Sequence, residues 1–301
     1  MIRPVGISDR LYLRELRADD LYSLATILCD KETMHHYPAP FSKKEVKSWI
    51  ERNIESYRQN GHGLWAVIMK EGDCFIGDCG ITLQEIEGEL LPELGYHIHK
   101  DRWNKGYATE ASSLCIRYAF DTLKLKKIYT YTAKDNGPSI RVAEKNGMQF
   151  IKSFQKTVME SVEDEVLYEL LSPKETVLAY WNGMNSNDFS KAAELFSDNY
   201  ICIWPQSSEL IRGKENFIAI NSYYPAQGRW VFSINSVIAE GDRVVSDVSI
   251  SDGDVKARAI TFHQIMNSKI IKQTEFWPDD YDAPGWRQQW VESFDNSEPL
   301  R

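Results

Sequence analysis

Two stretches in the first half of the chain combine residue types that phosphate binding and proton transfer need. In the segment DRWNKGYATEA, residues 101–111, Gly106 stands between a strand-like stretch and a helix-like one. A glycine there lets backbone N–H groups approach a phosphate, and the helix N-terminus adds partial positive charge. We therefore predict that the N–H groups from about Lys105 to Thr109 hold a pyrophosphate, although a lone glycine before a helix more often marks an ordinary turn.

The second stretch, ELGYHIH at residues 93–99, reads as a strand that carries ionisable groups. Strand alternation places Glu93, His97 and His99 on one face and the apolar residues between them on the other. Glu93 is the first candidate for a general base, acting through water, and His97 is the second. In the alternative interpretation Glu93 only anchors an incoming cation, and the histidines are packed or face solvent.

The elements that must position these residues follow from hydrophobic periodicity. Helices and strands alternate irregularly over the first half, which indicates an α/β fold with a mixed sheet. The expected helices cover 17–29, 42–61, 109–122 and 136–147. The expected strands cover 10–16, 64–70, 74–84, 93–99 and 127–133, with a closing hairpin formed by 149–155 and 165–171.

A second pattern begins near Ser172. Ser172 is expected to cap a helix with Pro173 at its first position. Two helices over 172–196 precede a strand and a third helix, and four strand-like runs joined by short turns follow. Helices first and an antiparallel meander last are typical of an α+β domain. We therefore predict two domains, residues 1–171 and 172–301.

Composition excludes several classes of protein. The 301 residues carry a net charge of -9, whereas a general nucleic-acid binder normally has a basic field. No apolar run reaches the length that spans a bilayer, and the first residues do not read as a signal peptide. The five cysteines are scattered without the spacing of a metal site. We expect a cytoplasmic protein with no metal, no membrane and no nucleic-acid partner.

The glycine segment and the later DNGPSIRVAEKNGMQF, residues 135–150, together resemble the GNAT superfamily of acetyl-coenzyme A-dependent N-acetyltransferases, most closely its RimJ/RimL-like branch. The resemblance covers about residues 8–171. The phosphate loop of that family reads Gln/Arg-x-x-Gly-x-Gly/Ala, so Gly106 and Ala108 match while Trp103 replaces the expected Gln or Arg. The later family motif matches at Asn136, Ser139, Glu144, Lys145 and Gly147.

The resemblance implies an α/β GNAT fold with a mixed central sheet, acetyl-coenzyme A as donor, and direct transfer in a ternary complex. The acceptor would be a primary amine, on a small molecule or at a protein N-terminus. Ser139 would protonate the departing thiolate, with Tyr131 as the alternative acid. The coenzyme-binding residues that it implies are Ile98, through its backbone N–H on the thioester oxygen, then Trp103, Asn104, Lys105, Gly106, Tyr107, Ala108 and Thr109 of the loop, and finally Asn136 and Ser139.

The second half resembles the SnoaL-like (nuclear transport factor 2-like) cone, an α+β fold, over about 173–292. Such a cone implies a pocket inside a curved sheet and often dimerises, so a homodimer is expected. An Asp247–His263 pair would suit proton transfer, although a lone strand histidine is more often packed structurally. The expected pocket residues are Tyr200, Trp204, Glu209, Asp247, Arg258, His263, Glu275 and Trp277.

Two other functions remain open at this stage. In the first, the cone is an isomerase or hydrolase and the GNAT-like half senses acetyl-coenzyme A. In the second, neither half catalyses a reaction, and the protein is a coenzyme-responsive binding module. Fold resemblance alone does not separate these possibilities.

Overall fold

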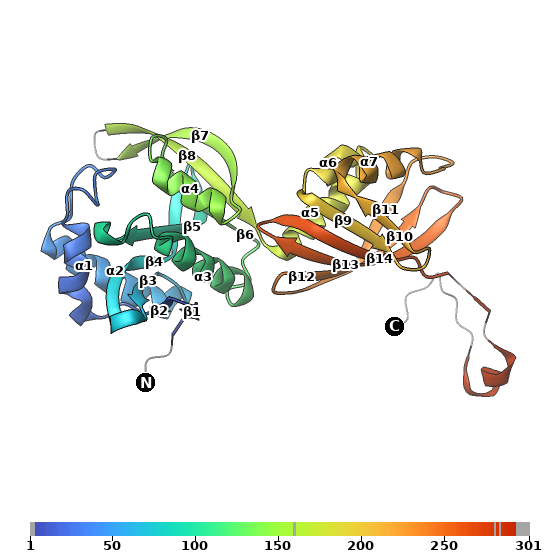
Figure 1. Cartoon of the computed structure of the whole chain (residues 1–301), viewed down its shortest axis with the longest axis horizontal. Helices are drawn as coiled ribbons and strands as arrows, with labels where there is room; N and C mark the ends of the chain where they lie inside the picture. The colour runs from blue at the N-terminus through green and yellow to red at the C-terminus, as the bar shows by residue number, and fades with distance from the viewer. Residues whose placement is uncertain (1–3, 159–160, 280, 283, 293–301) are drawn as a thin grey trace.

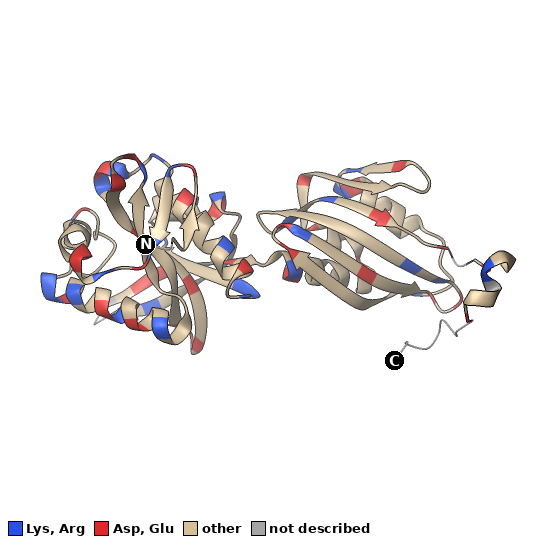
Figure 2. Cartoon of the chain, turned by 90° about the horizontal axis from the view of Figure 1, so that it is seen from below, with Lys and Arg blue, Asp and Glu red and all other residues tan. Residues whose placement is uncertain are grey.

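The computed structural model describes residues 4–158, 161–279, 281–282 and 284–292. Its ribbon forms two bodies that join where β8 ends and α5 begins (Figure 1). Lys and Arg are interspersed with Asp and Glu over both bodies (Figure 2). Within the described ranges, every helix is too short or too polar to cross a membrane.

The first body is built on an eight-stranded sheet in the order β1-β2-β3-β4-β5-β6-β8-β7, counted over the described residues. β5 and β6 pair in parallel, while the other neighbours are antiparallel, which confirms the mixed sheet. The strands are β1 (Gly6–Ile7), β2 (Leu11–Arg14), β3 (Leu64–Met69), β4 (Cys74–Ile86), β5 (Glu89–Ile98), β6 (Lys127–Ala133), β7 (Gln149–Val158) and β8 (Ser161–Leu171).

Helices cover both faces of this sheet. α3 (Tyr107–Asp121) packs against β2, β4 and β5, and α4 (Gly137–Lys145) packs against β6. α1 (Leu21–Leu28) and α2 (Lys43–Asn60) pack on the opposite face. β3 shows the consequence: Trp65 and Val67 belong to the core under α3, whereas Ala66 and Ile68 belong to the core under α1 and α2. A strand buried on both sides reads as a continuous apolar run.

The second body has a six-stranded sheet in the order β10-β9-β14-β13-β12-β11 within the described residues. Its strands are β9 (Phe196–Trp204), β10 (Glu209–Arg212), β11 (Val231–Glu240), β12 (Arg243–Ser251), β13 (Lys256–Met266) and β14 (Lys269–Phe276). Its helices are α5 (Pro173–Asn185), α6 (Phe189–Ala193) and α7 (Gly213–Tyr223), followed by the 3-10 turn η4 (Gly285–Trp290).

The sequence signals at the start of the second body are confirmed. Ser172 is the N-cap of α5, where its Oγ accepts a hydrogen bond from the Glu175 N–H, and Pro173 opens the helix. The four-residue strand β10 was not expected, because its residues lie in a polar stretch without clear alternation. Residues 293–301, which the predicted second domain includes, lie outside the described residues.

Candidate functional site

The two parallel strands β5 and β6 separate at the point where the first-half residues of interest lie. The single register pair between them joins Glu93 to Tyr129. The backbone N–H of His99 donates to the carbonyl oxygen of Ile76 on β4. Because successive residues of a strand direct their backbone groups to opposite sides, the N–H and C=O of Ile98 point away from β4, into the gap. The contact of the Ile98 N–H with a thioester oxygen stays a prediction.

The loop that follows β5 presents free backbone donors. Gly106 has a left-handed φ of 80° and Asn104 one of 58°, and α3 begins at Tyr107. The backbone N–H groups from Asn104 to Thr109 have no hydrogen-bond acceptor among the described residues. The first turn of a helix leaves such donors unpaired, and together with the helix dipole they form an anion site.

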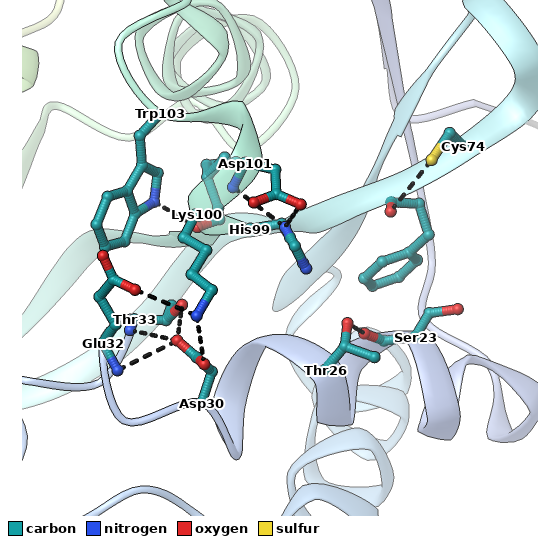
Figure 3. Close-up of polar contacts among 12 residues, drawn as sticks. Ser23, Thr26, Asp30, Glu32, Thr33, Cys74, His99, Lys100, Asp101 and Trp103 are labelled. Carbon is teal, nitrogen blue, oxygen red and sulfur yellow. Dashed lines mark hydrogen bonds and ion pairs between the residues drawn. The ribbon is translucent and has the colours of Figure 1, made fainter.

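Trp103, the departure from the family motif, has a defined structural role. Its indole Nε1 donates to the carbonyl oxygen of Ile98 at 2.7 Å (Figure 3). The ring also packs against the core under α3. Trp103 therefore ties the loop to the end of β5, and the anion site is left to backbone groups, which require no particular side chain.

Arg10, directly before β2, holds the same loop in place and was not among the predicted site residues. Its guanidinium donates to Glu110 at 2.7 Å and to the carbonyl oxygen of Lys105 at 2.9 Å. The guanidinium also lies 4.5 Å from the ring centre of Tyr107. No local pattern marks Arg10, because its partners are about a hundred residues away in the chain.

An open cleft of about 410 Å³ adjoins the loop and the first turn of α3. Two cations, Arg117 of α3 and Lys145 of α4, lie on it. Its other lining residues are Ser8, Gly106, Thr109, Glu110, Ser113, Leu114, Asn146 and Asn267, the last of which comes from the β13–β14 turn of the second body. The cleft thus joins free backbone donors to basic side chains.

Asn136 and Ser139 lie together at the start of α4. Asn136 is the N-cap, and its Oδ1 accepts the Ser139 N–H at 3.2 Å. The hydroxyl of Tyr96 lies beside Ser139: burial raises the pKa of Tyr96 to about 12, and Ser139 opposes this rise. Tyr96 belongs to the α3 side of the sheet. It is a candidate acid that the sequence analysis placed on a face without assigning a role.

Glu93 lies on the opposite face of the sheet from α3, as strand alternation predicted. Its Oε2 accepts a hydrogen bond from Thr82 on β4 at 3.0 Å. Burial raises the pKa of Glu93, against the lowering effects of Thr82, Lys156 and His97. A carboxylate with a raised pKa is a stronger base than an exposed one.

His97 is held in a fixed chain of polar groups. Its Nδ1 lies 2.8 Å from Asp78, which is fully buried, and its Nε2 lies 2.8 Å from the hydroxyl of Tyr37. Asp78 also accepts a hydrogen bond from Trp49 of α2. Burial lowers the pKa of His97, but the charge and hydrogen bond of Asp78, with the charge of Glu93, raise it overall. Nε2 already faces the Tyr37 hydroxyl, so a substrate amine would reach His97 only by displacing Tyr37.

The segment between α1 and α2 reaches this face because a salt bridge fixes it. Lys100, just after β5, lies 2.8 Å from Asp30 and 3.2 Å from Glu32 (Figure 3). The hydrogen bond from Lys100, with those from Thr33, lowers the pKa of Asp30 to about 2. This anchoring brings Tyr37, further along the segment, onto His97.

Residues of β6 and β7 complete the face of the sheet that carries Glu93. Tyr131 of β6 packs with Phe154 of β7, and Lys156 donates a hydrogen bond to the Tyr131 hydroxyl. Burial, with the charges of Glu93 and Glu165, raises the pKa of Tyr131. Tyr131 thus lies with Glu93, on the side of the sheet opposite Tyr96 and the α3 core.

Glu165 of β8 was missed by the sequence analysis. Only 5% of the residue is exposed, and its Oε2 has no hydrogen-bond partner among the described residues. Burial raises the pKa of Glu165 to about 7, helped by the charges of Glu163, Glu93 and Asp135 and opposed by Lys156. An acidic residue in the alternating segment SVEDEVLYELL reads as a solvent-facing one, so no sequence signal marked it.

In the second body, aromatic side chains fill the interior of the curved sheet. Tyr180 and Trp181 of α5 are fully buried there. The remaining cavity, of about 20 Å³, has room for about one water molecule. Of the predicted pocket residues, Trp204, Glu275 and Trp277 line it. Glu275 accepts hydrogen bonds from Trp204 at 3.1 Å and from Thr261 at 2.9 Å, and burial raises its pKa.

The other predicted pocket residues do not form one site. His263 is buried between Ser246 and Gln273, and burial lowers its pKa to about 3. Asp247 is paired with Arg258 through two hydrogen bonds on the other face of β12, so Asp247 and His263 do not meet. Glu209 is exposed at the start of β10, whereas Tyr200 is buried and donates to Gln273, the side chain that also contacts His263.

The aromatic residues near the end of the chain differ in their surroundings. Trp277 packs edge-on against Trp204 at the cavity. Tyr281, Trp286 and Trp290 are instead exposed, Trp286 by 72% and Trp290 by 70%. Only Trp277 therefore contributes to closing the interior.

Comparison with known proteins agrees with both folds. The model of the acetyltransferase (GNAT) domain family matches residues 10–149, and that of the SnoaL-like domain family matches residues 177–273. The uncharacterized protein YkkB of Bacillus subtilis is 33% identical over 151 residues, which are 50% of this chain and 88% of that protein. The uncharacterized N-acetyltransferase YnaD of the same species is 29% identical, over 54% of this chain and 94% of that protein.

Solved structures resemble each half separately. A GNAT-family acetyltransferase from Bacillus anthracis is 27% identical with a TM-score of 0.48, covering 55% of this chain and 97% of that one. An NTF-2 like protein of unknown function from Burkholderia xenovorans is 30% identical with a TM-score of 0.36, covering 41% of this chain and 95% of that one. The chain belongs to the GNAT acetyltransferase family and carries a SnoaL-like domain after its GNAT domain.

Proposed function

We propose that the protein is an N-acetyltransferase that moves an acetyl group from acetyl-coenzyme A directly to a primary amine. The observation that carries this proposal is the gap where β5 and β6 separate. On one side of the gap lies the loop with unpaired N–H groups, and on the other lies the half-buried Glu93, whose pKa is raised. A gap between a phosphate site and a base suits a phosphate-bearing donor that meets an amine.

The coenzyme fits the groups that are present. Backbone N–H groups from Asn104 to Thr109 bind the pyrophosphate, and Arg117 and Lys145 lie along the same cleft to attract further phosphate charge. The bound coenzyme supplies a thioester that an amine can attack. Ile98 directs its N–H at the oxygen of that thioester, where negative charge develops.

Proton transfers are assigned to residues on the two faces of the sheet. Glu93 accepts the proton of the attacking amine through water, because its pKa is raised and its face is the one that carries the acidic groups. His97 holds Tyr37 and is not the base, since a substrate amine would reach it only by displacing Tyr37. Ser139, beside the Tyr96 hydroxyl, returns a proton to the thiolate.

The SnoaL-like domain has a supporting role in this proposal. Its interior is filled by side chains, and its one predicted proton-transfer pair is separated. A neutral, buried His263 that is hydrogen-bonded on both nitrogens is typical of a structural residue. A homodimer through the sheet of this domain remains a prediction.

The first prediction concerns turnover. Acetyl-coenzyme A and a panel of primary amines, with N-terminal peptides as the protein class, are expected to release free thiol only when an acceptor is present. The measurement is a colorimetric thiol assay. Coenzyme binding without release by any acceptor would instead favour the sensing functions.

The second prediction concerns the base. Glu93→Gln is expected to lower kcat/KM about a hundredfold or more, because general-base catalysis typically contributes about 10²–10⁴. Coenzyme affinity, measured by calorimetry, is expected to stay unchanged. Glu89→Gln is the matched control, since it removes an exposed carboxylate from the same face of β5. Full activity of the Glu93 variant would remove this residue as the base.

The third prediction concerns the loop. Gly106→Val is expected to abolish measurable coenzyme binding in calorimetry, because a β-branched residue at a φ of 80° distorts the backbone that presents the N–H groups. Gly88→Val in the β4–β5 turn, where φ is 85°, is the control for the general cost of a strained residue. Normal binding by the Gly106 variant would disprove the phosphate-loop assignment.

A further inference from the structure

Within the part of the chain that the structure describes, the carboxylate of Glu165 is buried without a hydrogen-bond donor for one of its oxygens. It is almost fully buried, yet its Oε2 has no donor among the described residues. An unpaired buried charge is costly, so such a group in a native protein either takes up a proton or meets a cation or a ligand. Lys156 is close enough to lower the pKa of Glu165, but its Nζ donates to Tyr131 instead.

Strand register places Glu165 on the same face as Glu93. On β8, Val166 and Tyr168 belong to the core under α3, whereas Leu167 belongs to the small cluster on the opposite face. Alternation therefore puts Glu165 with Leu167 on that opposite face. The same cluster contains Tyr129 of β6, which pairs in register with Glu93 of β5, and paired residues of neighbouring strands share a face. The two carboxylates thus belong to one surface of the sheet.

The charges that face Glu165 are mostly negative. Glu163 from β8, Glu93 from β5 and Asp135 from the end of β6 each raise its pKa, and Lys156 from β7 lowers it. The α1–α2 segment adds the imidazole of His36, whose Nδ1 lies 3.6 Å from Asp135. It also adds the neutral hydroxyl of Tyr37, which is hydrogen-bonded to His97. A cation that enters here relieves repulsion among the carboxylates and gives Oε2 a donor.

We propose, resting on the acetyltransferase function above, that Glu165 binds a second ammonium group of the acceptor, so that the preferred substrates are diamines and polyamines. One amine, deprotonated, reacts near Glu93, while the other stays charged and binds Glu165. An ammonium group offers three N–H donors and a full positive charge, which suits a carboxylate with an unpaired oxygen. Glu165 is here a specificity-determining residue.

The test compares α,ω-diaminoalkanes with n-alkylamines of equal chain length in the thiol-release assay. The wild-type protein is expected to prefer the best diamine in kcat/KM by about tenfold or more, as a charge-assisted hydrogen bond contributes. Glu165→Gln is expected to abolish that preference by raising the KM for the diamine, with kcat and monoamine kinetics little changed. Asp164→Asn, an exposed neighbour on the other face of β8, is the control and should keep the preference.

The outcomes separate the two proposals. Equal kcat/KM for diamines and monoamines, or a preference that survives Glu165→Gln, overturns the Glu165 assignment and leaves the acetyltransferase function standing. If no amine releases thiol, the proposed function fails. Calorimetry of the diamine against the coenzyme-loaded protein then tests whether Glu165 binds an ammonium group. Diamine binding that Glu165→Gln removes supports it, and absence of binding overturns it.

Stability against pH gives a readout independent of turnover. Because the folded-state pKa of Glu165 is raised to about 7, the folded protein holds this proton more tightly than the unfolded chain. Its contribution to stability is therefore fullest below the ordinary carboxyl pKa and is lost as pH rises toward about 7. Glu165→Gln is expected to raise Tm above that of the wild type at about pH 8, with a smaller difference at about pH 5.

Saturating diamine is expected to raise the Tm of the wild type but not that of Glu165→Gln, because a ligand that binds only the folded state stabilises it. A Tm difference that does not vary with pH would contradict the burial of an unpaired carboxylate at this position. An equal diamine effect on both proteins would contradict the binding of a cation by Glu165.

Discussion

The separation of β5 from β6 is the constraint on which the site depends. The strands share one register pair, Glu93 with Tyr129, and beyond it the backbone groups of β5 that face β6 lack a strand partner. Unpaired backbone groups inside a sheet are costly unless something satisfies them. Trp103 satisfies the Ile98 carbonyl, and Thr130 satisfies that of Leu94. The gap is thus supported by specific bonds at both ends.

The two faces of the sheet at this gap have different chemistry. The α3 face is mainly apolar, and in the loop beside it Arg10 holds the turn in place through Glu110 and the Lys105 carbonyl. The opposite face carries buried and half-buried ionisable groups, and one of them, Asp78, is hydrogen-bonded to both His97 and Trp49. This asymmetry is consistent with a phosphate-bearing donor on one side and an amine on the other.

Among the described residues of the SnoaL-like domain, aromatic side chains narrow the interior to a cavity of about 20 Å³. Tyr180, Trp181 and Phe217 occupy the space inside the curved sheet, and Glu275 and His263 are hydrogen-bonded to neighbouring side chains. The second body nevertheless touches the first near the cleft beside the β5–α3 loop. Asn267 lines that cleft, and Ser268 donates to the Leu171 carbonyl. A domain that packs there helps to shape the cleft wall.

The sequence by itself determined the elements and the local chemistry. Periodicity predicted the mixed sheet, the cap at Ser172 and the face shared by Glu93 and His97, because these depend on residues a few positions apart. Tertiary structure alone decided the rest. Arg10 meets Glu110, Tyr37 meets His97, and Glu165 joins the surface of Glu93 only when segments distant in sequence become neighbours. The burial of Glu165, and hence its unpaired oxygen and raised pKa, depends on that packing and leaves no mark in the local pattern.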